Sequence, residues 1–475
     1  MKGKILISFL LTAVLFSCIS LKKTVKVDSK DEFIKISTKN PEYFETTNGH
    51  PWVPIMINFL PPDGKPEKVF KTIESYFKNF SENGGNAMRV WISASFLEIE
   101  DEKSGYYNPI KFERIDSLLQ LAAKYRIKIK FTLQHIRTIG TNNSWSNSQV
   151  LAIENKGPFK NILEYINTTE GKKYYLNRAR ALSERYKNNG QIYGWELWNE
   201  MDAVDYNDWL PFTCEILDSV KAMFPNQLVT QTLSSLHSED AAQRYKKLFV
   251  LPQNDFISLH RYLDPGKKWN QYNKTTLPID QLIYDAMKFA QSHVSNKPII
   301  INEIGAVEAN HAGPSHLYPL DTAGVLIHDM IFAPFFCGAA GCGSMWHWDS
   351  YVMRQNLWYH YKRFENCIQG IDPVAERFIS FTINKNGVRC YGLKGLAKTI
   401  IWCRDTSNNW NTELLQQIPA TSKNNFSLSI SEISNKNFTS AKIYDPWKNV
   451  WTILKIKNGQ VKFPTFLRSV ILIIE

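Results

Sequence analysis

The sequence lacks the patterns that mark several common classes of protein. No Gly-x-Gly-x-x-Gly motif follows the first strand-like segment, which disfavours a dinucleotide-binding fold. No His-x-x-x-His motif occurs and no cysteine spacing matches a metal site, so we expect no catalytic metal and no other cofactor. The net charge is +11, but the basic residues form no long block and do not alternate with aromatic residues, so nucleic acid is not an expected partner.

Charged residues are also few for a chain of this length. They make up 21% of the 475 residues and aromatic residues make up 13%, a composition typical of a folded globular protein. The length allows one large domain of roughly 250–350 residues and a smaller one of about 100. No internal repeat is visible. The six cysteines after residue 18 are scattered, and we interpret them as buried thiols without assigning a disulfide.

Residues 1–18 have the pattern of an export signal. A basic start precedes the apolar run ILISFLLTAVLF at 5–16, which is too short to span a membrane as a mature helix. Leu15-Phe16-Ser17-Cys18 resembles the lipobox of bacterial lipoproteins, which implies a lipid anchor on Cys18; an ordinary cleaved secretory signal is the alternative. By the same resemblance, Ser20 favours the outer membrane. We therefore expect an extracytoplasmic protein, membrane-anchored or secreted, with residues 19–31 as a solvated tether.

Between residues 32 and 372, short apolar segments alternate with segments of helical periodicity. The strand-like segments are 55–59, 86–92, 128–135, 193–199, 228–233, 256–262, 298–303 and 344–348, and the amphipathic helix-like segments are 66–82, 112–126, 171–189, 207–224, 239–249, 279–294 and 321–335. Strand followed by helix along about 300 residues predicts an α/β fold, a (β/α)8 TIM barrel.

The pattern changes after residue 372. Residues 376–475 contain short alternating runs such as KTIIWC and SVILII, separated by Asn, Gly, Ser and Pro. This pattern predicts a C-terminal β-sandwich of about 100 residues. The boundary is expected at 369–376, where Gly370, Asp372 and Pro373 lie.

Polar and aromatic side chains stand near the ends of almost all predicted barrel strands, where the active sites of such barrels lie. Two of them are glutamates: Glu200 follows the fourth strand and Glu303 ends the seventh. Glycosidic cleavage needs one carboxylic acid to protonate the leaving oxygen and one carboxylate to attack the anomeric carbon or activate water. Asn199 can hydrogen-bond a neighbouring sugar hydroxyl. The pattern therefore predicts glycoside hydrolysis.

The two glutamates also lie in recognisable motifs. Trp198-Asn199-Glu200 and Ile301-Asn302-Glu303 resemble the two catalytic strand ends of clan A retaining glycoside hydrolases, family 5 in particular, with its cellulases and mannanases. The resemblance implies that Glu200 is the acid/base, that Glu303 is the nucleophile and that Asn199 contacts the substrate 2-hydroxyl. Met201, where the family usually has proline, departs from the pattern outside the chemistry.

The same resemblance implies roles for residues on other strands. Arg89 and Tyr262 would hydrogen-bond the nucleophile and hold it ionised, His135 and His260 would line the subsite, and Trp346 would be the platform beneath the sugar. Each of these assignments except that of Tyr262 has an alternative: Arg89 pairs only with Glu196 in the barrel floor, His135 and His260 are satisfied core residues, or Trp348 is the platform in place of Trp346. Three further tryptophans in long loops either stack on additional sugar rings or anchor the loops: Trp145, Trp269 and Trp358.

The fourth strand carries more acid than the reaction needs. Strict alternation puts Glu196, Trp198 and Glu200 on one side of the strand, with Glu196 deeper in the barrel as a buried, satisfied carboxylate. Asp202 begins the following loop and is not expected to act directly. We also expect the charge of Glu303 to hold Glu200 protonated, and hence able to donate.

The sequence thus predicts a retaining β-glycosidase that cuts a β-linked polysaccharide, mannan or β-glucan, within the chain. The alternatives are a noncatalytic glycan-binding lipoprotein on the same barrel and an enzyme that transfers the sugar to another sugar instead of water. The C-terminal segment Tyr444-Asp445-Pro446-Trp447, followed by Gly459, resembles the small β-sandwich appended to many such barrels. It either binds polysaccharide or packs against the barrel.

Overall fold

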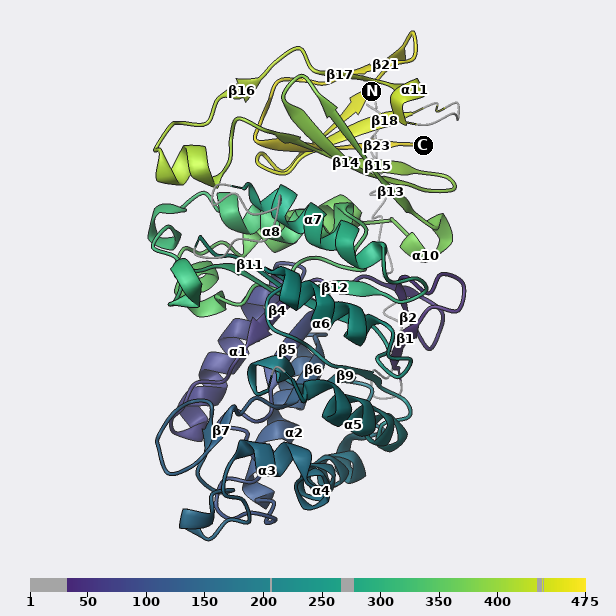
Figure 1. Ribbon diagram of the computed structural model, residues 1–475. Coiled ribbons are helices and arrows are strands. Elements are labelled where there is room, and N and C mark those ends of the chain that lie inside the picture. Colours follow the sequence, from purple (N-terminus) through teal and green to yellow (C-terminus); the bar gives the residue numbers. More distant parts are fainter. Residues whose placement is uncertain (1–31, 206, 266–276, 434–437, 439) are drawn as a thin grey trace, which may run out of the picture.

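The computed structural model describes residues 32–205, 207–265, 277–433, 438 and 440–475 (Figure 1). The predicted signal with Cys18, the tether at 19–31 and Trp269 lie outside the described residues. Within the described residues, no helix combines the length and the apolar character that crossing a bilayer requires.

The predicted barrel is present. Seven parallel strands form it: β4 (Met56–Phe59), β5 (Ala87–Trp91), β6 (Lys128–Gln134), β9 (Ile192–Trp198), β10 (Leu228–Thr230), β11 (Ile257–Leu263) and β12 (Ile299–Ala306). The eighth predicted segment makes only single bridges, in which Met345 pairs in parallel with Ile57 on β4 and with Ile304 on β12. A further bridge between Thr232 and Ser258 joins β10 to β11, so the ring closes.

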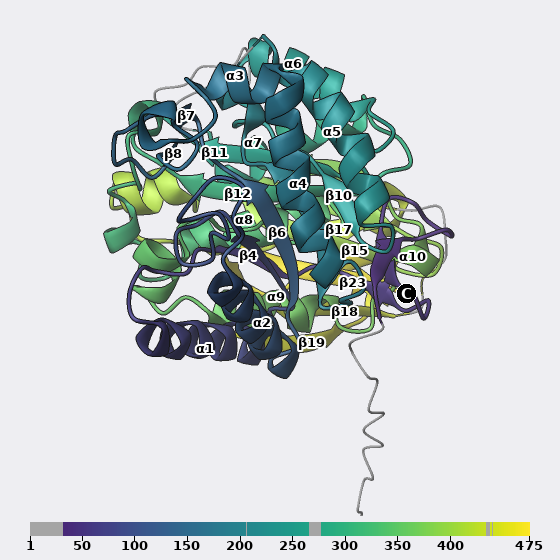
Figure 2. The ribbon, with the colours of Figure 1, turned by 90° about the horizontal axis from the view of Figure 1, so that it is seen from below.

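Helices surround these strands (Figure 2). The seven predicted helices correspond to α1 (Pro66–Glu82), α2 (Pro109–Lys124), α4 (Thr169–Tyr186), α5 (Trp209–Met223), α6 (Glu239–Phe249), α7 (Ile279–Gln291) and α8 (Val325–Phe336). Proline opens α1 and α2, where its missing N–H costs no helical hydrogen bond. Four shorter helices were not predicted: α3 (Ile162–Asn167), α9 (Tyr359–Ile368), α10 (Pro373–Glu376) and, in the C-terminal region, α11 (Ile430–Ile433).

Helix α8 differs from the amphipathic helix that the sequence predicts. All of its residues are buried, including His328, Asp329 and Pro334. Its outer side, which faces solvent in an ordinary barrel, is covered by the C-terminal sheet (Figure 1). The prediction of a polar outer face was therefore wrong because the helix is enclosed on both sides.

The C-terminal region is β-rich, as predicted. Its antiparallel sheet has the strand order β13 (Ile379–Lys385), β14 (Val388–Lys394), β15 (Thr399–Asp405), β23 (Ser469–Ile474), β18 (Ala441–Asp445) and β19 (Val450–Leu454). Short strands β17 (Ser427–Ser429), β20 (Ile456–Lys457) and β21 (Gln460–Lys462) form a second sheet. A separate core that includes Ile401, Leu428 and Val461 lies between the two, consistent with a β-sandwich.

The large sheet packs against α7 and α8 through buried charges. Arg389 pairs with Asp280 at 2.6 Å, and Arg404 pairs with Asp329 at 2.8 Å. The ring of Trp447 lies 4.5 Å from that of His328. The contacts favour a packing role for this region over a freely exposed binding module.

Candidate active site

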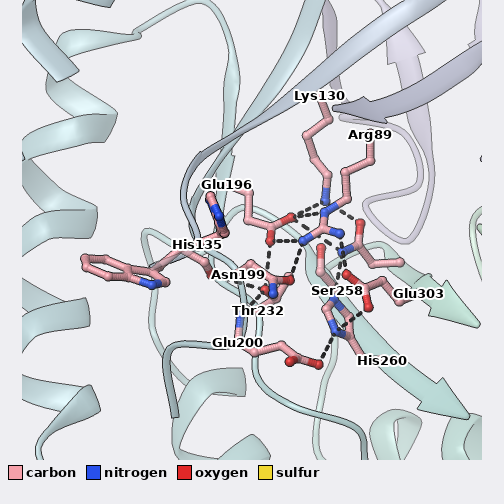
Figure 3. A network of polar contacts seen from close by, with 12 residues as sticks. Arg89, Lys130, His135, Glu196, Asn199, Glu200, Thr232, Ser258, His260 and Glu303 are labelled. Atoms are coloured by element: carbon pink, nitrogen blue, oxygen red, sulfur yellow. Dashed lines mark hydrogen bonds and ion pairs between the residues drawn. The ribbon is translucent and has the colours of Figure 1, made fainter. Parts of the chain in front are cut away.

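The two predicted catalytic glutamates meet at the C-terminal rim of the barrel (Figure 3). Glu200 follows β9 and has a left-handed backbone conformation, with φ of 52°, that ends the strand. Glu303 lies on β12. One carboxylate oxygen of each residue and a ring nitrogen of His260 lie within 4.8 Å of one another. The two carboxylates therefore face a common point.

An irregularity between β11 and β12 shapes this point. Leu259 pairs with Ile301, but the next residue, His260, pairs with Glu303, so Asn302 is an extra residue in a β-bulge. Bulges next to active sites redirect side chains that regular alternation would place on opposite faces. The bulge puts His260 beside Glu303, with 3.4 Å between His260 Nδ1 and Glu303 Oε2.

Glu303 is held by two further donors. Tyr262 donates its hydroxyl hydrogen to Oε2 at 2.8 Å, and Arg89 donates from a guanidinium nitrogen to Oε1. Both donors are buried, and the Glu303 side chain itself is 5% exposed. Arg89 and Tyr262 thus lie where the sequence places them, and together they fix the position of the Glu303 side chain.

Arg89 also contacts the residues behind the nucleophile. It forms a bidentate salt bridge with Glu196, with 2.7 Å between Nε and Oε2, and donates to Asn199 Oδ1 at 2.8 Å. The two roles weighed for Arg89 are therefore not alternatives, because one guanidinium serves both Glu196 and Glu303. Because the oxygen of Asn199 accepts from Arg89, the amide nitrogen of Asn199 is the group that can donate to another partner.

Glu196 is the buried, satisfied carboxylate that the sequence predicts. It accepts hydrogen bonds from Arg89, from Lys130 at 3.0 Å and from Thr232 at 2.8 Å. Burial raises its pKa, but the charges of Arg89 and Lys130 outweigh burial and hold the pKa well below the usual range. Trp198 does not share its side of the strand: its ring packs against Tyr175 of α4 and Phe212 of α5, so the prediction of strict alternation was wrong there.

Glu200 has two partners of its own. Arg137 donates to Oε2 at 2.6 Å, and His260 Nδ1 lies 3.1 Å from Oε1. Burial raises the pKa of Glu200, but the hydrogen bond from His260 and the charge of Arg137 outweigh it, so the pKa lies below its usual value. The expectation that Glu303 holds Glu200 protonated was wrong for the protein without substrate, because Arg137 and His260 favour the charged form of Glu200. The contact was missed because no sequence pattern indicates that Arg137 lies at this position.

Aromatic rings line one side of the site. Trp346 lies 5.1 Å from Trp91, which stacks on His135 at 4.9 Å, and His135 stacks on Trp145 at 5.8 Å. Both ring nitrogens of His135 are occupied, one by Ser93 and one by the Trp145 carbonyl oxygen, each at 2.7 Å. His135 thus belongs to this aromatic wall and does not contact the carboxylates.

A cavity of about 740 Å³ opens along the aromatic wall. The loops after β4, β5 and β6 enclose it, and amide and hydroxyl side chains such as Asn143, Ser148 and Gln149 line it. Trp145 is 62% exposed and lies at this cavity, whereas Trp358 is buried against Tyr76 and serves as an anchor. Of the three loop tryptophans, the described residues thus leave Trp145 available for stacking.

Trp348 and Asp202 have structural contacts. Trp348 packs edge-on against Phe59 and the barrel core, whereas Trp346 packs beside Trp91 in the aromatic wall. Asp202 is buried and accepts hydrogen bonds from the backbone and the hydroxyl of Ser234, at 2.7 and 2.6 Å, and from Arg244. As expected from the sequence, Asp202 lies in the loop after β9; its contacts order that loop.

Comparison with known proteins agrees with this geometry. Residues 46–323, more than half of the chain, match the family model of the cellulases, glycosyl hydrolase family 5. The chain belongs to glycosyl hydrolase family 5.

Two relatives of this family 5 chain show the extent of the likeness. The mannan endo-1,4-beta-mannosidase F of Aspergillus clavatus is 22% identical over 317 residues, which cover 58% of this chain and 63% of the fungal protein, less than two thirds of its length. The crystal structure of a family 5 glycoside hydrolase from Bacteroides vulgatus superposes with a TM-score of 0.59 at 14% identity and covers 93% of both chains. At this identity the second likeness shows the fold, and it extends over the C-terminal sheet.

Three residues of this family 5 site were not predicted: Lys130, Arg137 and Trp91. Lys130 lies within an apolar strand segment, and its alternation with Thr132 and Gln134 was a usable signal that it points inward. Trp91 ends β5 and was likewise visible as a strand-end ring. Arg137 lies beyond β6 in a loop, where no periodicity indicates the direction of a side chain.

Proposed function

We propose that this protein is a retaining β-glycosidase that works by double displacement. The separation of the two carboxylates carries the proposal. Their oxygens approach within 4.8 Å, which agrees with the roughly 5–5.5 Å between carboxyl groups of retaining enzymes and not with the roughly 6.5–9.5 Å of inverting ones. Membership of family 5 supports the same chemistry.

In the first step, a Glu303 carboxylate oxygen attacks the anomeric carbon while the bond to the leaving oxygen breaks and Glu200 gives that oxygen a proton. In the second step, Glu200 takes a proton from water, the water oxygen attacks the anomeric carbon and Glu303 leaves as a carboxylate. Asn199 donates to the 2-hydroxyl of the sugar, and Trp346 supports its ring. Two observations support these roles. Arg89 already donates to the oxygen of Asn199, which leaves the amide nitrogen to donate, and Trp346 lies beside Trp91 in the aromatic wall.

The acid step requires a change at Arg137. A carboxylate paired with a guanidinium is a poor proton donor, because the positive charge favours its ionised form. Arg137 is 31% exposed in its side chain and lies over the ring of Trp145, so it has room to move. In the proposed cycle the incoming leaving-group sugar displaces Arg137, and Glu200 then takes up its proton.

A β-linked polysaccharide is the proposed substrate, with mannan first and β-glucan second. The cavity volume lies in the range of ligand sites, and its tryptophans, amides and hydroxyls suit sugar rings. The mannan endo-mannosidase among the relatives favours mannan, and the cellulase family model keeps β-glucan as the second candidate. Trp145, which is 62% exposed at this cavity, offers a stacking surface for a further sugar ring and so supports cleavage within the chain.

Sugar release from a panel of β-linked polysaccharides tests the proposal. The chain lacking residues 1–18 is compared with Glu303→Gln and with Glu113→Gln, an exposed glutamate on α2 as matched control. Activity on one polymer that is lost only in Glu303→Gln supports the assignment. Silence on all polymers with tight glycan binding favours the noncatalytic alternative, and activity that survives in Glu303→Gln shows that the nucleophile is misassigned. Product analysis at high acceptor concentration separates hydrolysis from sugar transfer.

Anchoring through a lipid on Cys18 is a separate part of the proposal. Its support is the sequence pattern at 1–18. We expect the full chain to fractionate with membranes and Cys18→Ala to be released or left unprocessed. The mass of the mature N-terminus distinguishes a lipidated cysteine from a cleaved secretory signal.

A further inference from the structure

A buried polar chain runs from Lys130 through Asn302 to His260. Figure 3 shows its two ends, Lys130 and His260. Lys130 on β6 donates from Nζ to Glu196 Oε2 at 3.0 Å and to Asn302 Oδ1. Asn302 Nδ2 lies 3.0 Å from His260 Nε2. Lys130, Asn302 and His260 have no exposed surface, so this chain cannot touch a sugar. Its contacts instead end on the one ring nitrogen of His260 that faces away from both carboxylates.

The contact with Lys130 decides which way the amide of Asn302 points. An ammonium group has only hydrogens to donate, so the atom beside it must be the amide oxygen. The amide nitrogen then faces His260, and it too carries only hydrogens. His260 Nε2 must therefore accept, and the single proton of a neutral ring lies on Nδ1.

The fold builds this arrangement with the bulge in β12. Because Asn302 is the extra residue there, both Asn302 and Glu303 reach the inside of the barrel, although they are consecutive. Lys130 is available as a cation at neutral pH: burial lowers its pKa, and the charge of Glu196 limits the fall to about 8. The donor, the amide and the histidine are thus set by the backbone and by a side chain that is mainly cationic at neutral pH.

We propose that Lys130 and Asn302 are positioning residues that hold His260 as a neutral imidazole with its proton on Nδ1, directed at Glu200 and Glu303. Nδ1 lies 3.1 Å from an oxygen of Glu200 and 3.4 Å from one of Glu303, so one hydrogen serves whichever carboxylate is charged. With the proton on Nε2, the Nδ1 lone pair would face two carboxylates and repel both. The catalytic meaning of this inference rests on the proposed function, whereas its structural content does not.

Other titratable groups also face His260. Glu196 on β9 accepts a hydrogen bond from Asn302 Nδ2 at 3.4 Å, and the hydroxyl of Tyr245 on α6 accepts the backbone N–H of His260 at 3.2 Å. Among the described residues, the charged and titratable groups near the ring include Glu196, Glu200, Glu303, Lys130, Arg89, Arg137, His311, Tyr245 and Tyr262.

Nitrogen NMR of the protein labelled with 15N-histidine tests the tautomer directly. The signal of His260 is identified by its loss in His260→Asn and, independently, by its shift in Glu200→Gln. We expect the wild-type protein at neutral pH to show a protonated Nδ1 and an unprotonated Nε2. A neutral ring with the proton on Nε2, or a doubly protonated ring, would overturn the proposal. The wild-type spectrum identifies the tautomer even if every variant of Lys130 and Asn302, the relay that ends at His260, fails to fold.

Asn302→Asp sharpens the test because it keeps the shape and puts an oxygen opposite Nε2. We expect Nε2 to become protonated, and kcat to fall roughly 10- to 100-fold with little change in KM. Lys130→Met, which frees the amide to flip, should give a mixture of the two tautomers. Asn226→Asp, an exposed asparagine outside the site, is the matched control and should change neither property. A fall in kcat that follows lost thermal stability, with the tautomer unchanged, would reduce the relay to a structural role and contradict the proposal.

The two proposals fail in different ways. The expected tautomer in a protein that cleaves no glycan would leave the relay intact and defeat the proposed function. An active glycosidase whose His260 carries its proton on Nε2 would do the reverse.

Discussion

Two of the buried arginine–carboxylate pairs of this molecule invite comparison, one at the catalytic centre and one between the barrel and the C-terminal sheet. At the centre, Arg89 holds Glu196 and Glu303, and Glu303 still has its other oxygen near the cleft. Between the barrel and the C-terminal sheet, Arg404 and Asp329 pair with each other, and 0% and 1% of their side chains are exposed, so neither can reach a ligand. We call the pair at the catalytic centre the open pair and the pair of Arg404 with Asp329 the closed pair. The open pair supports the reaction, whereas the closed pair holds the C-terminal sheet against the barrel.

The largest effect should come from the open pair. Glu303→Gln removes the attacking carboxylate, and we expect kcat to fall on the order of 10⁴-fold, as when other covalent nucleophiles are removed. The fold should persist, because glutamine keeps an oxygen for Arg89 and Tyr262. Steady-state kinetics with a chromogenic β-glycoside measures the loss, and circular dichroism checks the fold. Loss of the fold would mean that this pair, too, serves mainly as attachment.

The closed pair should affect stability and leave the reaction alone. Arg404→Met strands the buried carboxylate of Asp329, and we expect the free energy of unfolding to fall by about 3–5 kcal/mol. Adding Asp329→Leu should recover part of the loss, because no charge is then left unpaired. Denaturant unfolding measures both values. A double variant that is no better than the single one would show that the pair itself, not the stranded charge, stabilises the contact.

Arg137 offers a smaller, pH-dependent test on the open side. Arg137→Gln removes a positive charge from Glu200, so the pKa of Glu200 should rise and its protonated form should survive to higher pH. We expect the basic limb of kcat/KM against pH to move upward by about one unit. Arg180→Gln, an exposed arginine on α4, is the control. A downward shift would mean that Arg137 assists the acid form.

Trp145 should give the smallest effect, since it covers the open side without touching either carboxylate. Trp145→Ala should raise KM roughly three- to tenfold with kcat nearly constant, and Trp145→Phe should restore most of the affinity. Titration with oligosaccharides of increasing length measures the change. An equal loss in kcat would assign Trp145 to the reacting centre through its contact with Arg137.

The open and the closed pair also differ in how far they could be predicted from the sequence. The open site was largely predictable, because strand ends converge in a barrel and local motifs mark Glu200 and Glu303. The orientation of Trp198 and the position of Arg137 were not, since both depend on an irregular strand end and a loop. The closed pair was invisible for a different reason: Asp329 and Arg404 are 75 residues apart, and nothing local relates them.

The buried helix α8 couples the unfolding of the barrel to that of the C-terminal sheet. It belongs to two packing layers at once, with barrel strands on one side and the C-terminal sheet on the other. Neither layer can separate without exposing a largely apolar face to water, so melting should be a single cooperative transition. A chain truncated after α10 would then be an aggregation-prone fragment rather than a smaller enzyme.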